Sequence, residues 1–238
     1  MNPKSPTRPR PFVLLNLAMT ADGKITTANR QVSGFSSRRD QQHLLELRAT
    51  ADAVMSGART VDLNPVTLGP GPAKYRRLRL KRGLAEHNLR IVVSGAGSVA
   101  PTSEIFKTRF SPVIVLVSRH ASASRLAALR EVAGEVKIFG NKEINFSQAL
   151  RWLRQTWHVK RLLCEGGGEV NGALFRAGLV DELHLTISPA IFGGRAAPTI
   201  ADGVGASTLN QGTQLKLKSA KRHGDEMFLI YRVINRKK

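Results

Sequence analysis

Short apolar runs alternate along most of the chain with stretches in which apolar residues recur every three or four positions. Runs of the first kind are typical of buried strands, and they cover residues 12–18, 52–56, 90–94, 112–118, 136–139 and 161–164. Stretches of the second kind predict amphipathic helices, over residues 37–50, 122–132, 147–157 and 170–177. Alternating strands and helices favour an α/β fold with a mostly parallel central sheet and helices on both faces.

The last third of the chain has a different pattern. Residues 182–188, 214–220 and 226–233 read as consecutive strands with no strong helix between them, which predicts an antiparallel C-terminal edge to the sheet. No internal repeat or long linker interrupts the chain. We therefore expect a single domain over residues 11–238, preceded by a basic flexible tail of residues 1–10.

The composition excludes several classes of protein. A single cysteine in 238 residues excludes a disulfide framework, and the six histidines lack metal-ligand spacing, so we expect no metal site. No apolar run reaches the roughly 18–20 residues of a membrane span, and no signal peptide is evident. These features predict a cytoplasmic protein with no membrane partner.

The net charge of +20 raises the question of a nucleic-acid partner. Residues 1–10, 74–82 and 216–238 hold 17 of the 37 basic residues, and the rest of the chain has a net charge of only +5. Aromatic residues make up 5%, too few for stacking platforms on single strands, and no recognition motif occurs. We expect no dedicated nucleic-acid partner.

A glycine-rich segment follows the strand predicted at 161–164. Glu165 is followed by Gly166, Gly167 and Gly168, and a helix begins directly afterwards. Glycines let backbone N–H groups approach a ligand, and a helix N-terminus favours negative charge, so the segment suits a phosphate or pyrophosphate. The spacing matches neither GxGxxG nor a P-loop, and a tight turn without any ligand explains the residues equally well.

Two further polar loops follow predicted strands, where open α/β sheets bind ligands. Residues 18–25 (AMTADGKI) contain Asp22 and Lys24, and residues 56–65 (SGARTVDLNP) offer Thr60, Asp62 and Asn64. Turn chemistry and an ordinary surface charge explain the first loop as well. Arg48 ends the preceding helix, where a cation also complements the helix dipole.

Taken in order, these motifs resemble the reductase domain of bacterial riboflavin biosynthesis and its stand-alone archaeal and fungal relatives, the diaminopyrimidine reductases. The resemblance covers residues 11–233. It rests on AMTADGKI, Leu47-Arg48 before Asp52-Ala53, GARTVDLNP, EGGGEVNGALF, the GLVDEL segment at 178–183 and PAIFGG at 189–194. It implies a dihydrofolate reductase-like fold. It also implies NADPH-dependent hydride transfer to C1′ of a ribosylaminopyrimidine 5′-phosphate, of either the aminouracil or the diaminopyrimidine type.

The resemblance also implies roles for individual residues. The cofactor-binding positions would be Ala18, Phe35, Thr60, Asn64 and Ser94, with a pyrophosphate loop of Gly167, Gly168, Glu169, Val170, Asn171, Gly172 and Ala173. Substrate contacts would come from Ser33, Arg48, Asp62 and Glu165. Lys24 and Glu165 are the predicted catalytic residues. Family members are commonly dimers, so we expect a homodimer, in which the C-terminal edge strands could pair.

The sequence departs from the family pattern at one place. The segment from Thr60 to Pro65 is one residue shorter than usual, and the arginine expected after it, near the substrate phosphate, is missing. Either Lys74, Arg76 or Arg77 replaces it, or the substrate is another pteridine- or pyrimidine-like compound without a phosphate. The zinc deaminase domain of the bifunctional riboflavin enzyme needs more cysteines than Cys164, so we expect a reductase standing alone.

Overall fold

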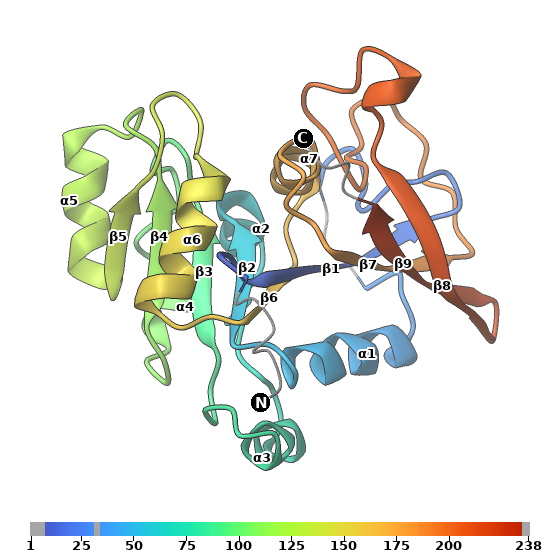
Figure 1. The fold of residues 1–238 in the computed structure, drawn as a ribbon, viewed down its shortest axis with the longest axis horizontal. Coiled ribbons are helices and arrows are strands. Elements are labelled where there is room, and N and C mark those ends of the chain that lie inside the picture. The colour runs from blue at the N-terminus through green and yellow to red at the C-terminus, as the bar shows by residue number, and fades with distance from the viewer. Residues whose placement is uncertain (1–7, 31–33, 235–238) are drawn as a thin grey trace, which may run out of the picture.

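The computed structural model describes residues 8–30 and 34–234, which contain one nine-stranded sheet (Figure 1). Its strand order is β5-β4-β3-β2-β6-β1-β7-β9-β8. The strands are β1 (Phe12–Thr20), β2 (Ala53–Gly57), β3 (Leu89–Val93), β4 (Val113–Val117), β5 (Glu135–Ile138), β6 (Arg161–Cys164), β7 (Glu182–Ser188), β8 (Gln214–His223) and β9 (Glu226–Ile234). Pairing is parallel from β5 through β7, and antiparallel where β9 meets β7 and β8. The predicted sheet is confirmed.

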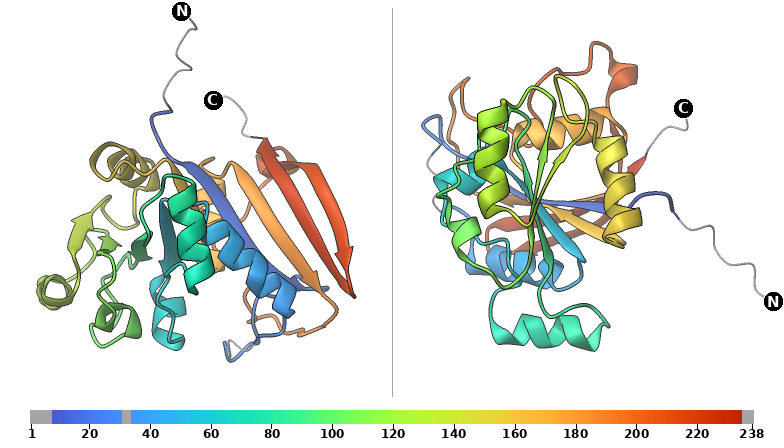
Figure 2. Two further views of the ribbon diagram at one scale, coloured as in Figure 1. Left: turned by 90° about the horizontal axis from the view of Figure 1, so that it is seen from below. Right: turned by 90° about the vertical axis from the view of Figure 1, so that its left-hand side faces the viewer.

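Helices cover both faces of this sheet (Figure 2). They are α1 (Arg38–Arg48), α2 (Ala58–Leu63), α3 (Ala73–Lys81), α4 (Glu104–Lys107), α5 (Ala123–Val132), α6 (Phe146–Thr156) and α7 (Gly168–Arg176), with a short 3-10 turn, η1 (Leu209–Gln211). Strand residues alternate between two cores. Leu15 of β1 packs with Leu150 of α6 and Leu174 of α7, whereas Leu14 packs on the side of Leu47 of α1.

The sequence pattern missed three helices. Residues 58–63, interpreted as a loop, form α2, whose N-cap Gly57 makes no side-chain capping bond, so no capping residue marks its start. The basic segment at 74–82 lies almost entirely in α3, which buries only Tyr75 and Arg79. Helix α4 has four residues. Short or largely polar helices carry too few apolar positions to show a helical period.

Helix α1 is fixed to the rest of the molecule at both ends. At its start, the buried Glu226 of β9 accepts hydrogen bonds from the backbone N–H (2.8 Å) and hydroxyl (2.5 Å) of Ser37. At its end, Arg79 of α3 donates to the carbonyls of Arg48 (2.7 Å) and Ala51 (2.6 Å). The basic helix therefore holds the last turn of α1 in place.

The predicted flexible tail ends in residues that are held in place. Arg8 and Arg10 both pair with Asp181, at 3.0 and 2.6 Å, just before β7 begins. The prediction for residues 1–7 lies outside the described residues.

Candidate active site

A cavity of about 890 Å³ opens at the carboxyl ends of β2, β3 and β6, beside β1. Its walls come from the start of α2 (58–60), the turn after β3 (94–96) and the glycine run after β6 (165–170). Asn16 and Ala18 of β1, Phe35, and Asp40 of α1 close another side, and Pro198 and Asp202 come from the long loop after β7. Ligands bind at this edge of open parallel sheets, so the geometry marks the cavity as the candidate site.

The glycines after β6 have two different tasks. A Cβ on Gly167 would meet only the Thr60 hydroxyl, at 3.8 Å, so Gly167 presents open backbone to the cavity at the start of α7. A Cβ on Gly168 would lie 2.2 Å from the Asp202 carboxylate, and one on Gly172 would lie 2.0 Å from the Asp202 carbonyl. Gly168 and Gly172 therefore let the segment around Asp202 pack against α7.

The cavity lining includes only part of the predicted pyrophosphate loop. Gly167, Gly168, Glu169 and Val170 line the cavity, and Gly166 joins them. The remaining predicted positions are not among the lining residues: Asn171, Gly172 and Ala173. Asn171 is buried, and its amide donates to the carbonyls of Gly166 and Ile200, both at 3.0 Å. Asn171 thus ties the glycine run to the loop after β7.

Glu165 lines the cavity, whereas Arg48 is not among the lining residues and holds Glu165 in an ion pair with two hydrogen bonds. The guanidinium Nε and Nη2 each donate to one carboxylate oxygen of Glu165 at 2.6 Å, and Nη1 donates to the Gly69 carbonyl at 2.8 Å. Both side chains are nearly buried, with exposed fractions of 12% and 13%. Burial disfavours the charge on Arg48, but the charge and hydrogen bonds of Glu165 outweigh it and raise the pKa of the guanidinium. Two residues predicted to touch the substrate therefore hold each other.

The other predicted residues divide between the cavity and its supports. Ala18, Phe35, Thr60, Ser94 and Asp62 line it. The Asp62 carboxylate also accepts from the Ser103 hydroxyl at 2.5 Å. The Asn64 amide donates to the Thr60 carbonyl at 2.8 Å, so Asn64 closes the end of α2 and is not among the lining residues. Ser33 lies outside the described residues.

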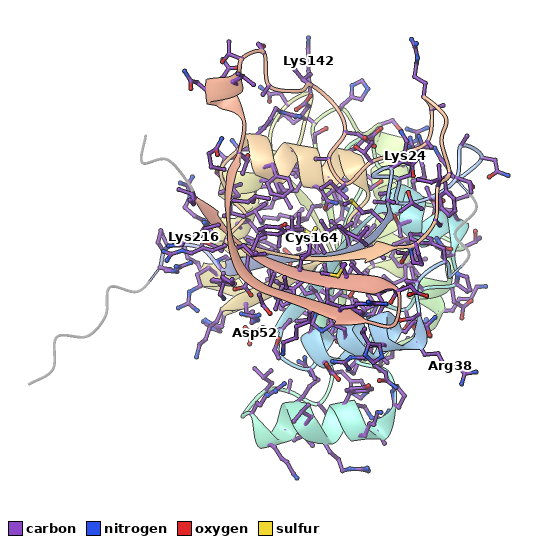
Figure 3. All side chains as sticks on the ribbon, turned by 90° about the vertical axis from the view of Figure 1, so that its right-hand side faces the viewer. Lys24, Arg38, Asp52, Lys142, Cys164 and Lys216 are labelled. Atoms are coloured by element: carbon purple, nitrogen blue, oxygen red, sulfur yellow. The ribbon has the colours of Figure 1, made fainter. Side chains whose placement is uncertain are left out.

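Lys24 is held beside the cavity by the loop after β7. Its ammonium donates to the Ala197 carbonyl at 3.2 Å, and Lys24, labelled in Figure 3, is not among the residues that line the cavity. The neighbouring Asp22 accepts from the backbone N–H of Gly193 at 2.7 Å and from the Thr20 hydroxyl at 2.5 Å. The Thr20 hydrogen bond is the main cause that lowers the pKa of Asp22. The DGK motif thus joins the loops after β1 and β7.

The basic helix α3 supplies no residue to the cavity lining. Arg76 pairs with Glu86 at 3.0 Å, and the Lys74 ammonium lies 4.7 Å from the centre of the Tyr75 ring. Among the described residues that line the cavity, the basic ones are Arg30 and Arg59. Arg59 lies 3.7 Å from Glu169 in the first turn of α7. Sequence reasoning did not single out either arginine, although Arg59 stands inside the GARTVDLNP motif.

Two properties concern the whole described chain. No group of three or more His, Cys, Asp or Glu side chains within it could hold a metal ion. None of its helices is long and apolar enough to cross a membrane.

Cys164 is buried and free, and burial raises the pKa of its thiol to about 12.

The strand order, the antiparallel C-terminal hairpin and the cavity beside a glycine-initiated helix define a dihydrofolate reductase-like fold. The model of the RibD C-terminal domain matches residues 11–229. The chain belongs to this family.

Named relatives agree with this assignment. The chain is 34% identical to the 2,5-diamino-6-ribosylamino-4(3H)-pyrimidinone 5′-phosphate reductase of Methanothermobacter thermautotrophicus, over 94% of this chain and 99% of the relative. It is 35% identical to the Archaeoglobus fulgidus protein of the same name, over 82% and 87%. A pyrimidine reductase-like protein from Corynebacterium diphtheriae superposes with a TM-score of 0.78 at 26% identity, covering 94% and 92% of the two chains.

Proposed function

We propose that this protein is an NADPH-dependent reductase of riboflavin biosynthesis that transfers a hydride to C1′ of a ribosylaminopyrimidine 5′-phosphate. The observation that carries the proposal is a single cavity that joins the open glycine start of α7 to a buried polar wall under α1. The names of relatives that match nearly the whole chain support the same reaction.

The residues of the cavity suit a dinucleotide phosphate. The backbone of 166–170 and the N-terminus of α7, a nine-residue helix, would hold the pyrophosphate, because unpaired N–H groups and the helix dipole favour anions. Arg59, beside α7, would take the additional phosphate that distinguishes NADPH from NADH. Ala18, Phe35, Thr60 and Ser94 would line the path of the cofactor. When bound, the cofactor supplies the hydride.

The substrate would lie against the wall formed by α1 and the end of β6. Reduction of a ring-opened imine adds a hydride to C1′ and a proton to the adjacent nitrogen. The Glu165 carboxylate, oriented by Arg48, would stabilise positive charge on that imine. Lys24, predicted as catalytic, would either orient the substrate or supply a proton. Of the two arginines that line the cavity, Arg30 is the one that does not pair with α7. We propose that Arg30 binds the substrate phosphate in place of the arginine that the family pattern has and this sequence lacks.

A fluorescence titration with both nicotinamide cofactors tests the cofactor half of the proposal. NADPH should bind more tightly than NADH, and Arg59→Ala should reduce that preference by about tenfold or more, the scale of one charge-assisted hydrogen bond. Arg77→Ala, on the exposed side of α3, is the matched control and should change nothing. Binding of neither cofactor would contradict the proposal.

We further propose that the protein is a cytoplasmic homodimer. Along β8 and β9, the face that continues the α7 side of the sheet carries Leu215, Leu217 and Met227, with exposed fractions of 41%, 53% and 37%. Exposed apolar side chains on one face of a sheet favour a binding surface there, and a second copy of the same face is its simplest complement. The cytoplasm remains the compartment that a single free cysteine favours.

A further inference from the structure

Asp40 is a buried carboxylate that lines the candidate site and has one oxygen without a hydrogen-bond partner among the described residues. It lies in the first turn of α1 with an exposed fraction of 7%. Its Oδ1 atom makes no hydrogen bond to any described residue. The same side chain lines the cavity. Leaving a buried carboxylate oxygen without a hydrogen bond is costly, so this position needs an explanation.

Helix capping does not explain Asp40. Its place three residues after the N-cap Ser37 is the one from which an acidic side chain normally reaches back to the N-cap N–H. Here the Ser37 N–H already donates to Glu226 Oε1 at 2.8 Å. Ser37 Oγ still accepts from the Asp40 backbone N–H at 3.3 Å, so the cap is complete without the Asp40 carboxylate. Glu226 has taken over the role that Asp40 would otherwise have.

Asn16 adds a second unpartnered polar group to the same wall. It alternates along β1 with Leu15 and Leu17, which face α6 and α7, so its side chain points toward the α1 side. Its exposed fraction is 7%, its Oδ1 has no partner among the described residues, and it lines the cavity. Of the three buried polar side-chain atoms without a partner in the described chain, two therefore face one cavity.

A ligand that satisfies these unpaired groups must present N–H donors to Asp40. An ionised carboxylate accepts only, and two adjacent N–H donors suit its two oxygens. A 2-amino-4(3H)-pyrimidinone ring carries such an edge, with the 2-amino group beside N3–H. A uracil ring instead places a carbonyl oxygen at C2, which would face the Asp40 carboxylate with like partial charge.

We propose that Asp40 binds the 2-amino and N3–H edge of a diaminopyrimidinone substrate and thereby selects it over the corresponding aminouracil. Asn16 completes this edge, because its amide offers either a donor or an acceptor by rotation. The inference rests on the proposed reductase function and adds the specificity determinant of the same site. Selection by hydrogen bonding is strong, since a mismatched ring leaves buried polar groups unpaired.

The test measures kcat/KM for the wild type and Asp40→Asn with two substrates: the ribosylated 5′-phosphates of 2,5,6-triaminopyrimidin-4(3H)-one and 5,6-diaminouracil. The wild type should prefer the former. Asp40→Asn should lower kcat/KM for it by roughly 10- to 100-fold, the scale of a hydrogen bond to a charged group. The same variant should gain activity on the uracil compound, because an amide can accept from N3–H and donate to a carbonyl. Asp225→Asn, a carboxylate-to-amide change on the exposed β8–β9 turn, should leave the ratio unchanged.

The possible failures are distinguishable. If the wild type turns over both compounds and Asp40→Asn leaves their ratio unchanged, the role of Asp40 is wrong and the reductase function stands. If the wild type turns over neither, both proposals fail. If the variant does not fold, a measurement on the wild type alone still tests the proposal. Binding of 2,6-diaminopyrimidin-4(3H)-one should raise the melting temperature of the wild-type protein more than binding of 6-aminouracil does. Equal shifts would overturn the role of Asp40.

Discussion

Arg48 and Glu165 are the two residues whose mutual contact most constrains the chemistry of the site. Each was predicted to touch the substrate, and the structure joins them by two 2.6 Å hydrogen bonds with little solvent access. Glu165 follows the last residue of β6 and Arg48 is the last residue of α1. The pair therefore links the helix to the strand end beside the glycine run.

Removing one partner of this pair should leave the other as an uncompensated, nearly buried charge. Arg48→Met leaves a nearly buried carboxylate unpaired, and Glu165→Gln leaves a nearly buried cation, each at a cost of about 3 kcal/mol in the free energy of unfolding. The double variant should lose clearly less than the sum of the two. Urea unfolding of all four proteins measures this coupling, and strictly additive losses would contradict it.

Local sequence motifs identified several residues that line the cavity, and the ligand-binding roles of these residues stay predictions. Thr60, Ser94 and Gly167 each lie within three residues of the end of a strand that an apolar run marks, and each lines the cavity. The sequence did not identify Asp40 as a site residue, because its position in the first turn of α1 is typical of a capping residue. Here Glu226, which lies far away in the chain, accepts the hydrogen bond from the Ser37 N–H that Asp40 would otherwise accept. Arg30 lines the cavity from an irregular loop without any periodic signal.

At the scale of elements, α7 and the loop after β7 depend on one another through glycine. Because Gly172 makes room for packing and Gly167 faces the cavity, a methyl group added at each should affect a different property of the protein. Gly172→Ala should lower the melting temperature, because its Cβ would meet the Asp202 carbonyl at 2.0 Å. Gly167→Ala has space on the protein side, so its melting temperature should stay near that of the wild type while NADPH binding weakens.

Calorimetry and cofactor titration of both glycine variants check this prediction. A Gly167→Ala protein that binds NADPH normally would show that the backbone there does not approach the cofactor. A Gly172→Ala protein of unchanged stability would mean that the segment around Asp202 can move away at no cost.

The docking of α1 on β7 includes a buried histidine pair that predicts a pH dependence. His43 Nε2 and His184 Nδ1 lie 2.9 Å apart, and burial is the main cause that lowers the pKa of both imidazoles. Glu46, Arg39 and Asp40 of α1 act electrostatically on His43. Glu182, paired with Lys218 of β8, also pairs with His184.

Because the unfolded chain binds protons near the ordinary histidine pKa and the folded chain binds them only at lower pH, stability should fall as the pH drops below about 6.5. It should be constant between about pH 7 and 8, where both imidazoles are neutral in both states. His43→Gln should reduce the slope between about pH 5 and 6.5. Urea unfolding across this range measures the slope, and stability that rises on acidification would contradict the assignment. The Glu182 carboxyl, whose pKa is lowered, titrates below this window.

The strands were predictable to within a few residues because a doubly covered parallel strand is almost entirely apolar. Val113–Val117 shows this: all five residues are buried. Helix α3 was not predictable in the same way, since one of its two buried residues is Arg79, whose guanidinium donates to the carbonyls of Arg48, the last residue of α1, and Ala51. The basic segment that looked like a replacement phosphate site is thus partly a structural support.

For the whole molecule, the exposed apolar face of β8 and β9 predicts association. Sedimentation should give about twice the chain mass of 26.0 kDa, and Leu217→Lys should shift the protein to monomer by placing a charge within that face. Lys216 lies opposite Arg232 in the strand register, on the other face of the sheet, and is labelled in Figure 3. Lys216→Ala is therefore the matched control and should remain dimeric. A monomeric wild type would contradict the proposed dimer.

The central claim is that one cavity binds NADPH and a ribosylaminopyrimidine 5′-phosphate and transfers a hydride between them. The most direct measurement follows NADPH oxidation with 2,5-diamino-6-ribosylamino-4(3H)-pyrimidinone 5′-phosphate and identifies the product by mass. We predict that NADPH is oxidised and that the product is heavier than the substrate by two hydrogen atoms and carries an open ribityl chain. With NADH, the same product should form much more slowly. Absence of any such product, or turnover only of compounds without the phosphate, would contradict the account.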